Sequence, residues 1–154
     1  MWDIDKDILT QTMASRSQRS ILAHKTVNIE ESGHYTGPEG DTYDISTDVE
    51  QAKTNTKLYS PKQLLELVHQ PTADCDSGTQ PRLEVTGEGA VGAARRLAEL
   101  YSNVTLLNFA SAKNPCGGML GGARAQEESI GVCSSLHSCL TQNRLQEGYY
   151  SLHR

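Results

Sequence analysis

The chain has 154 residues, enough for one domain with a single core, although its apolar fraction of 36% is low. Its net charge of −5 argues against a nucleic-acid or anionic-membrane surface as the main partner. The N-terminus is acidic and no apolar run has membrane-spanning length, so we expect a soluble intracellular protein of the cytoplasm or nucleus.

The first predicted elements follow from capping and periodicity. Residues 15–24 are expected to form a helix, with Ser15 near its cap and an apolar pair facing inward. After it, Val27 and Ile29 alternate with polar residues, which predicts a short half-buried strand.

Turn chemistry then predicts a hairpin and a second helix. The segment 37–41 (GPEGD) is a strong turn signal, so 34–36 and 42–45 are expected to pair as antiparallel strands. Ser60 supplies a capping hydroxyl and Pro61 suits the first helical turn, which predicts a short helix after residue 60. Its apolar stripe consists of Leu64, Leu65 and Val68.

The second half of the chain has an α/β pattern. Residues 83–86 are predicted as a strand, 90–101 as an alanine-rich helix, and 104–109 as a strand covered on both sides. These three elements form a predicted βαβ unit with a parallel sheet. A glycine-rich loop follows, and then a helix from about 125 to 141.

The segment Gly87–Gly92 reads GxGxxG between a predicted strand and a predicted helix, the context of a dinucleotide-binding loop. That motif needs an acidic residue at the end of the next strand, where Leu107 and Asn108 stand. A tight strand-to-helix turn, which favours glycine, is therefore the preferred interpretation, and an NAD-binding protein that uses Gly87–Gly92 remains an alternative.

The second glycine motif, KNPCGGMLGG at 113–122, leaves the carboxyl end of a predicted buried strand, where ligands of α/β sheets bind. It lacks the GK[ST] ending of a P-loop. The pairs at 117–118 and 121–122 allow close backbone approach and positive φ, and the amides of such a loop suit a phosphate.

Glu127 and Glu128 follow in the first turn of the next helix. Because neighbouring helical residues point about 100° apart, the two carboxylates are expected to have different roles. Acidic residues also favour a helix N-terminus in general, and it is the glycine loop directly upstream that favours a functional pair.

The run NFASAKNPCGGMLGGARAQEES, from Asn108, closely resembles the microbial-type poly(ADP-ribose) glycohydrolases, whose hallmark is GGG, a short spacer and QEE on a macrodomain. EVTGEGAVGAARRLAEL and HYTGPEGDTYDI upstream are also similar to that family. The resemblance covers roughly residues 15–150 and is most specific over 104–129.

The resemblance implies an α/β fold: a macrodomain-like three-layer α/β/α arrangement with a mixed sheet. Residues 1–60 would form a helical and hairpin accessory region. Residues 61–154 would form the N-terminal half of the catalytic domain, within a single domain overall, with the C-terminal part of the fold missing.

The resemblance also implies a glycosidase that hydrolyses the ribose–ribose O-glycosidic bond and releases ADP-ribose. Glu128 would be the general acid and base, and Glu127 would bind ribose hydroxyls and position the linkage. Gln126 would support the loop. No metal or cofactor is implied, and the partner would be ADP-ribose, poly(ADP-ribose) or an ADP-ribosylated protein. The expected ligand-binding residues are Asn108, Ser111, Asn114, Gly117, Gly118 and Gln126.

Two departures from the family bear on activity: the missing C-terminal part of the fold and the residue at position 116. Cys116 stands where the family's glycine triplet begins, and a side chain there is costly if the position needs positive φ. A catalytically inactive ADP-ribose-binding module, or a truncated fragment, is therefore an alternative to the enzyme. The four cysteines lack the spacing of a metal site and are expected to be free thiols: Cys75, Cys116, Cys133 and Cys139.

Overall fold

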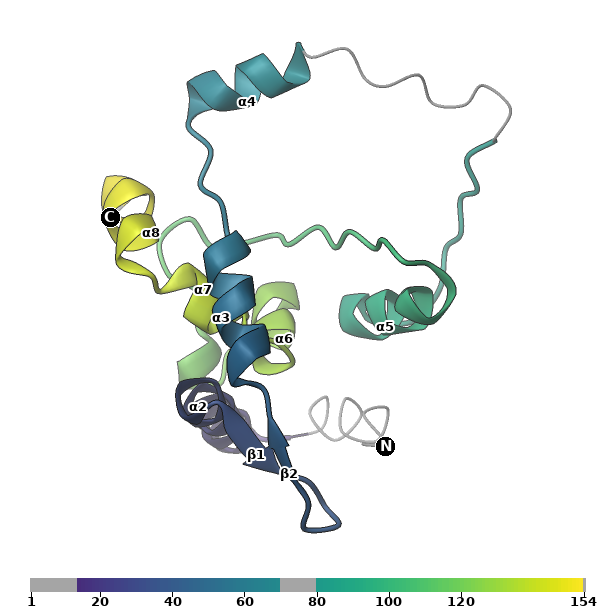
Figure 1. Cartoon of the computed structure of the whole chain (residues 1–154), viewed down its shortest axis with the longest axis vertical. Helices are drawn as coiled ribbons and strands as arrows, with labels where there is room; N and C mark the ends of the chain where they lie inside the picture. Colours follow the sequence, from purple (N-terminus) through teal and green to yellow (C-terminus); the bar gives the residue numbers. More distant parts are fainter. Residues whose placement is uncertain (1–13, 70–79, 154) are drawn as a thin grey trace.

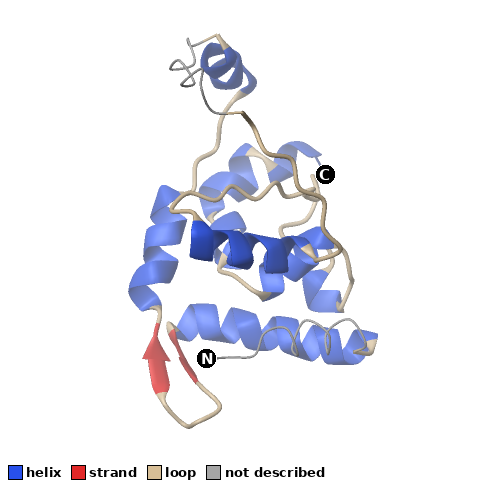
Figure 2. Cartoon of the chain, turned by 90° about the vertical axis from the view of Figure 1, so that its right-hand side faces the viewer, coloured by secondary structure: helices blue, strands red, loops and turns tan. Residues whose placement is uncertain are grey.

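The computed structural model describes residues 14–69 and 80–153. Most of its helices gather around the glycine-rich loop, whereas α4 stands apart from them (Figure 1). The hairpin lies at the opposite end of the molecule from α4 (Figure 2). Cys75, predicted to be a free thiol, lies outside the described residues. None of the helices in the described ranges is long and apolar enough to span a membrane.

The first helix, α2 (Arg16–Ser32), begins at Ser15 as predicted, with a reciprocal capping box between Ser15 and Gln18. It continues past residue 24 and ends at Gly33, whose φ of 72° forms a left-handed C-cap. The strand predicted around Val27 and Ile29 is therefore wrong. These residues lie inside the helix, where Val27 packs against the core.

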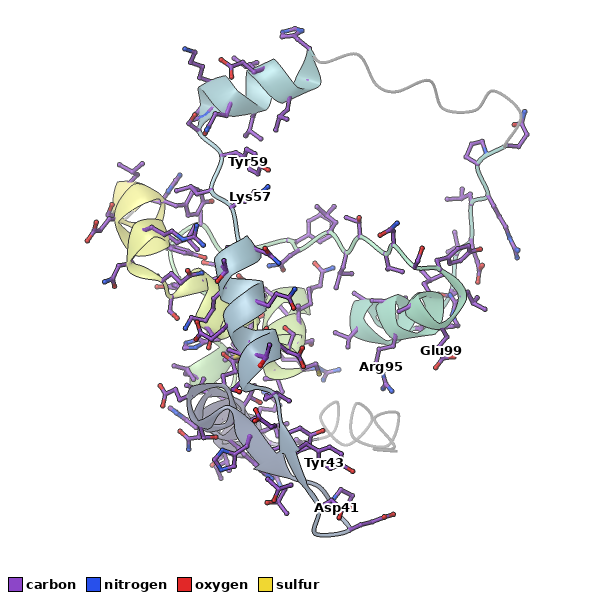
Figure 3. The ribbon with its side chains drawn as sticks, in the orientation of Figure 1. Asp41, Tyr43, Lys57, Tyr59, Arg95 and Glu99 are labelled. Atoms are coloured by element: carbon purple, nitrogen blue, oxygen red, sulfur yellow. The ribbon has the colours of Figure 1, made fainter. Side chains whose placement is uncertain are left out.

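The predicted hairpin is confirmed. Strands β1 (His34–Thr36) and β2 (Thr42–Asp44) pair antiparallel, and Tyr35 stacks on Tyr43 with ring centroids 5.1 Å apart. Figure 3 shows Tyr43 on this hairpin, near Asp41 in the turn. Helix α3 (Ser46–Asn55) follows directly.

Helices α4 (Pro61–Val68) and α5 (Ala90–Leu100) also form where they were predicted. Ser60 caps α4 through a second capping box, with Gln63. The apolar stripe of α4 stays in solvent, since Leu65 is 61% and Val68 78% exposed.

The predicted βαβ unit is present only as its helix. Within the described ranges the one sheet is the β1–β2 hairpin, and residues 83–86 and 104–109 are irregular. The strand predictions for these two segments are wrong here. A buried parallel strand needs neighbouring strands to take its backbone hydrogen bonds, and none lies beside either segment among these residues.

The last part of the chain is a series of short helices. The single helix predicted over 125–141 is broken, because Ser134 bonds back to the carbonyl of Ile130 and its hydroxyl then accepts the N–H of Leu136. The elements are η1 (Met119–Gly121), α6 (Gln126–Val132), α7 (Leu136–Leu140), α8 (Asn143–Gly148) and η2 (Tyr150–His153).

The core lies where α2 meets the glycine loop. Ala23, Cys116 and Met119 are buried together. The partly buried residues around them are Val27, Val132, Leu136 and Leu140. Helix α2, from the N-terminal part of the chain, thus packs directly on the glycine loop.

Candidate active site

Three consecutive residues at the start of α6 bind three places in the chain that precedes the helix: the extended segment before the glycine loop, the start of the loop and its middle. The first, Gln126, binds the extended segment before the loop through both amide atoms. Its Oε1 accepts the N–H of Phe109 at 2.9 Å, and its Nε2 donates to the carbonyl of Leu107 at 2.9 Å. This pair of bonds copies the pairing that a neighbouring strand would offer, so one side chain fixes residues 107–109.

The second residue, Glu127, is 3% exposed and carries one unsatisfied atom. Its Oε2 accepts the backbone N–H of Ser111 at 2.7 Å. Its Oε1 is buried and has no hydrogen-bond partner among the described residues. A buried carboxylate oxygen without a donor is costly, so this atom is suited to a ligand hydroxyl.

The third residue, Glu128, is half-buried and faces a different part of the loop. Its Oε1 accepts the N–H of Gly118 at 3.0 Å. Glu127 and Glu128 therefore bind loop residues seven positions apart, Ser111 and Gly118, as their 100° separation on the helix predicts. One carboxylate is sequestered and the other is accessible.

Gly117 has to be glycine because of these carboxylates. Its φ is 56°, and a Cβ there would lie 2.5 Å from Oε1 of Glu128. Neither the backbone conformation nor the space admits a side chain. The glycine predicted to approach a ligand closely thus approaches the protein's own carboxylate.

Loop-internal hydrogen bonds occupy several of the predicted ligand-binding groups. The N–H of Gly117 donates to the carbonyl of Asn114 at 2.9 Å, and the N–H of Gly118 donates to Glu128. The hydroxyl of Ser111 accepts the N–H of Lys113 and of Asn114 and so shapes the turn. Contacts of these residues with a ligand remain predictions.

Asn108 is positioned differently from those loop residues. It lies between the two residues that Gln126 binds, and its Oδ1 is buried without a hydrogen-bond partner among the described residues. This atom and Oε1 of Glu127 are thus two unsatisfied acceptors on the segment that the QEE triplet holds.

Cys116 combines strained backbone with complete burial. Its φ is 54°, in the left-handed region, and its side chain is 0% exposed. The thiol packs in the core with Ala23 and Met119. Burial is the main cause that raises the pKa of the Cys116 thiol to about 12, and the negative charge of Glu127 is the second. The departure from the glycine triplet is therefore accommodated as a neutral core residue.

A cleft of about 950 Å³ lies between α5 and α6, and the GxGxxG segment borders it, whereas the 113–122 loop contributes Met119 to its lining. Gly87 and Gly89 line it on one side, Gln126 and Glu128 on the other. Arg95 and Glu99, which project from the same side of α5 in Figure 3, also border it.

The GxGxxG segment lacks the features of a dinucleotide loop in this structure. Neither Gly87 nor Gly89 has a positive φ, and a Cβ at either position would meet nothing within 4 Å. Residues 83–86 form no strand before it. The two glycines are thus required neither by the backbone nor by packing.

Sequence reasoning missed three residues that contact the loop from outside. Arg16, Arg19 and Ser20, all on α2, bond to the loop carbonyls of residues 120–122. They lie 100 or more positions away, and no local signal in the sequence could have found them. Within the described ranges, no three His, Cys, Asp or Glu side chains gather as a metal site would require.

Comparisons with known proteins agree with this geometry. The family described as microbial-type PARG (poly(ADP-ribose) glycohydrolase), catalytic domain, matches residues 23–154. The chain is similar to the poly(ADP-ribose) glycohydrolase from Thermomonospora curvata, solved by X-ray crystallography, with 41% sequence identity and a TM-score of 0.82. The match covers 89% of this chain and 49% of the glycohydrolase chain. The same enzyme bound to the inhibitor ADP-HPD is 40% identical with a TM-score of 0.75, over 89% and 47%. A comparison with curated proteins gave no match.

The chain thus spans about half the length of the solved structures it matches, and it shares their α/β fold over that span. The family match includes the glycine loop and the QEE triplet, the segments on which the resemblance rested. The chain therefore belongs to the family of microbial-type poly(ADP-ribose) glycohydrolase catalytic domains.

Proposed function

We propose that this chain binds an ADP-ribose unit of poly(ADP-ribose) and hydrolyses its ribose–ribose O-glycosidic bond. The observation that carries the proposal is the arrangement of Glu127 and Glu128 behind the glycine loop. One carboxylate is buried with an unsatisfied oxygen, and its neighbour is accessible at the edge of a cleft. Glycosidases commonly use two carboxyl groups whose different environments give them different roles, one of which is proton exchange with the leaving group.

In the proposed complex, the buried acceptors bind the ribose. Oε1 of Glu127 and Oδ1 of Asn108 lack donors among the described residues, and ribose hydroxyls supply donors. A matched glycohydrolase has been solved bound to the inhibitor ADP-HPD, which supports an ADP-ribose-like ligand for this chain. The same acceptors suit free ADP-ribose, the polymer and an ADP-ribosylated protein.

Glu128 is the proton donor of the proposed reaction. As the glycosidic bond breaks, its carboxylic acid gives its proton to the leaving ribose oxygen, and the sugar carbon becomes oxocarbenium-like. The resulting carboxylate takes a proton from the attacking water, whose oxygen bonds to that carbon. The Gly118 N–H holds one oxygen of Glu128 throughout, which fixes the orientation of the group that exchanges the proton.

The direct test combines binding and turnover on the same variants. We expect Glu128→Gln to keep ADP-ribose affinity in calorimetry and to lower poly(ADP-ribose) turnover by roughly 10²–10⁴-fold. We expect Glu127→Gln to weaken ADP-ribose binding, because it alters the buried acceptor. Glu39→Gln, at an exposed turn of the hairpin, is the matched control and should change neither.

The outcomes separate two functions. Near-normal turnover by Glu128→Gln contradicts the assignment of the general acid. ADP-ribose binding by the unsubstituted chain without release of ADP-ribose from the polymer shows a binding module instead of an enzyme. An absence of ADP-ribose binding contradicts both.

A further inference from the structure

Three side chains on one face of α2 donate to three successive carbonyls of the glycine loop. Ser20 Oγ donates to Leu120 O at 2.6 Å. Arg16 Nε donates to Gly121 O, and Arg19 Nε to Gly122 O, both at 2.9 Å. Positions 16, 19 and 20 are spaced i, i+3 and i+4, so α2 presents these donors together.

The carbonyls that receive these bonds lie at the end of the short helix η1 (Met119–Gly121). The last carbonyls of a helix have no partner within it and need donors from elsewhere. The side chains of α2 supply those donors. The N-terminal helix thus caps the loop helix from outside.

Gly122 shows how closely α2 approaches. Its φ is 72°, and a Cβ there would lie 2.0 Å from the carbonyl oxygen of Arg16. The two strained glycines of the loop therefore serve opposite neighbours. Gly117 makes room for Glu128, whereas Gly122 makes room for the backbone of α2.

A short chain of hydrogen bonds connects α2 to Glu128. The N–H groups of Gly121 and Ala123 both donate to the carbonyl of Gly118, at 3.0 and 3.1 Å. The N–H of that same Gly118 donates to Glu128. Residues 118–123 thus form one tight turn, held by α2 at its far end and holding Glu128 at its near end.

From this connection we propose that Arg16, Arg19 and Ser20 are positioning residues: α2 holds the glycine loop and thereby orients Glu128. All three lie before residue 23, where the family match begins. The inference rests on the proposed function for the role of Glu128. It assigns to the start of α2 a task in the reaction in addition to its place in the core.

Ser20→Ala is the sharpest variant, because alanine is a better helix former than serine and the helix itself is not weakened. The test measures amide hydrogen exchange of residues 116–123 by mass spectrometry, together with the urea midpoint. We expect exchange of the loop to rise roughly fivefold, the effect of one lost hydrogen bond, with little change in the midpoint. Ser17→Ala, an exposed serine in the first turn of α2, is the matched control and should leave exchange unchanged.

The functional arm uses poly(ADP-ribose) turnover by the same variants. We expect Ser20→Ala to lower kcat several-fold at nearly constant KM, since the proton donor is less well oriented while the ribose acceptors are untouched. Ser20→Thr keeps the hydroxyl and should restore kcat. The double variant Arg16→Ala/Arg19→Ala should lower kcat further than Ser20→Ala.

Each outcome decides the proposal. Unchanged loop exchange in Ser20→Ala and in the double variant overturns it, as does faster exchange with unchanged kcat. If the unsubstituted chain neither binds nor cleaves its substrate, the proposed function fails, and the role of α2 in orienting a catalytic Glu128 fails with it. The exchange measurement then still shows whether α2 holds the loop.

Discussion

The molecule contains two regions of opposite character, and the candidate site lies between them. The loop region, residues 16–32 and 116–132, is closely packed: Cys116 is 0% and Met119 2% exposed. The extended region, residues 80–89 and 101–109, leaves its apolar side chains in solvent, with Leu83 91% and Val85 89% exposed.

The start of α6 joins the two regions. Gln126 binds the extended region at Leu107 and Phe109, whereas Glu128 binds the loop region at Gly118. Gln126 and Glu128, in one helical turn, thus contact two different regions: the extended region, held by polar side-chain contacts, and the loop region, held by packing. This difference predicts that similar substitutions have very different effects in the two regions.

The largest expected contrast is between two Gly→Ala substitutions. In the loop region, Gly122→Ala places a Cβ 2.0 Å from the Arg16 carbonyl oxygen at a φ of 72°. We expect it to cost about 4 kcal/mol, combining a left-handed backbone penalty of about 1 kcal/mol with overpacking of about 3 kcal/mol.

The control lies in the extended region. A Cβ at Gly87 meets nothing within 4 Å, and φ there is not positive, so Gly87→Ala should change stability by less than about 0.5 kcal/mol. Urea midpoints of the two variants measure the difference. Equal midpoints would show that α2 does not pack on the loop as described.

A second contrast compares truncated apolar side chains. Met119→Ala removes a buried side chain from the core and should cost about 3 kcal/mol. Phe109→Ala removes a side chain that is 76% exposed, and its backbone bond to Gln126 remains, so we expect a change within about 0.5 kcal/mol. Thermal unfolding of both variants tests this, and a comparable loss for Phe109→Ala would mean that the extended region is packed in solution.

The same division separates what the sequence could predict from what it could not. The starts of α2 and α4 and the β1–β2 hairpin were predicted because their signals are local: capping boxes at Ser15 and Ser60, and the turn at 37–41. The strand at Val27 was wrong because the capping glycine, Gly33, lies further along and extends the helix over it. The parallel strands failed because strand pairing depends on distant partners.

The site was predictable to the same extent. The triplet Gln126–Glu128 closely follows its loop in the sequence, so the sequence alone predicts one site that contains the loop and two carboxylates with different roles, whereas the ligand contacts stay predictions. The contacts of α2 with the loop join residues about 100 positions apart, and nothing near Arg16 or Ser20 in the sequence announces them. Their discovery needed the three-dimensional structure.

A third prediction concerns the buried thiol of the loop region at alkaline pH. Burial raises the pKa of Cys116 from 9.0 to about 12, so above pH 9.0 the unfolded chain ionises while the folded chain stays neutral. The contribution of Cys116 to the free energy of unfolding is therefore complete below pH 9.0. Between pH 9.0 and about pH 12 it falls by roughly 1 kcal/mol per pH unit. The urea midpoints of the unsubstituted chain and of Cys116→Ala are measured at about pH 8 and at about pH 10.5. We expect the midpoint of Cys116→Ala to fall less between these two pH values. Equal slopes for the two chains would contradict the burial of the thiol.

The smallest effect is expected for the ion pair that joins the extended region to α5, in which Nη2 of Arg96 lies 2.6 Å from Oε1 of Glu88. The hydrogen bond from Arg96 lowers the pKa of Glu88 below 4.5, so the pair contributes above that pH and is lost as the pH falls through the lowered value. Because both side chains contact water, salt screens the pair. In about 1 M NaCl we expect Glu88→Gln to leave the urea midpoint unchanged. At low salt and above pH 4.5 we expect a midpoint slightly below that of the unsubstituted chain. A large loss that persists in salt would show that this pair holds the extended segment before α5 against the helix.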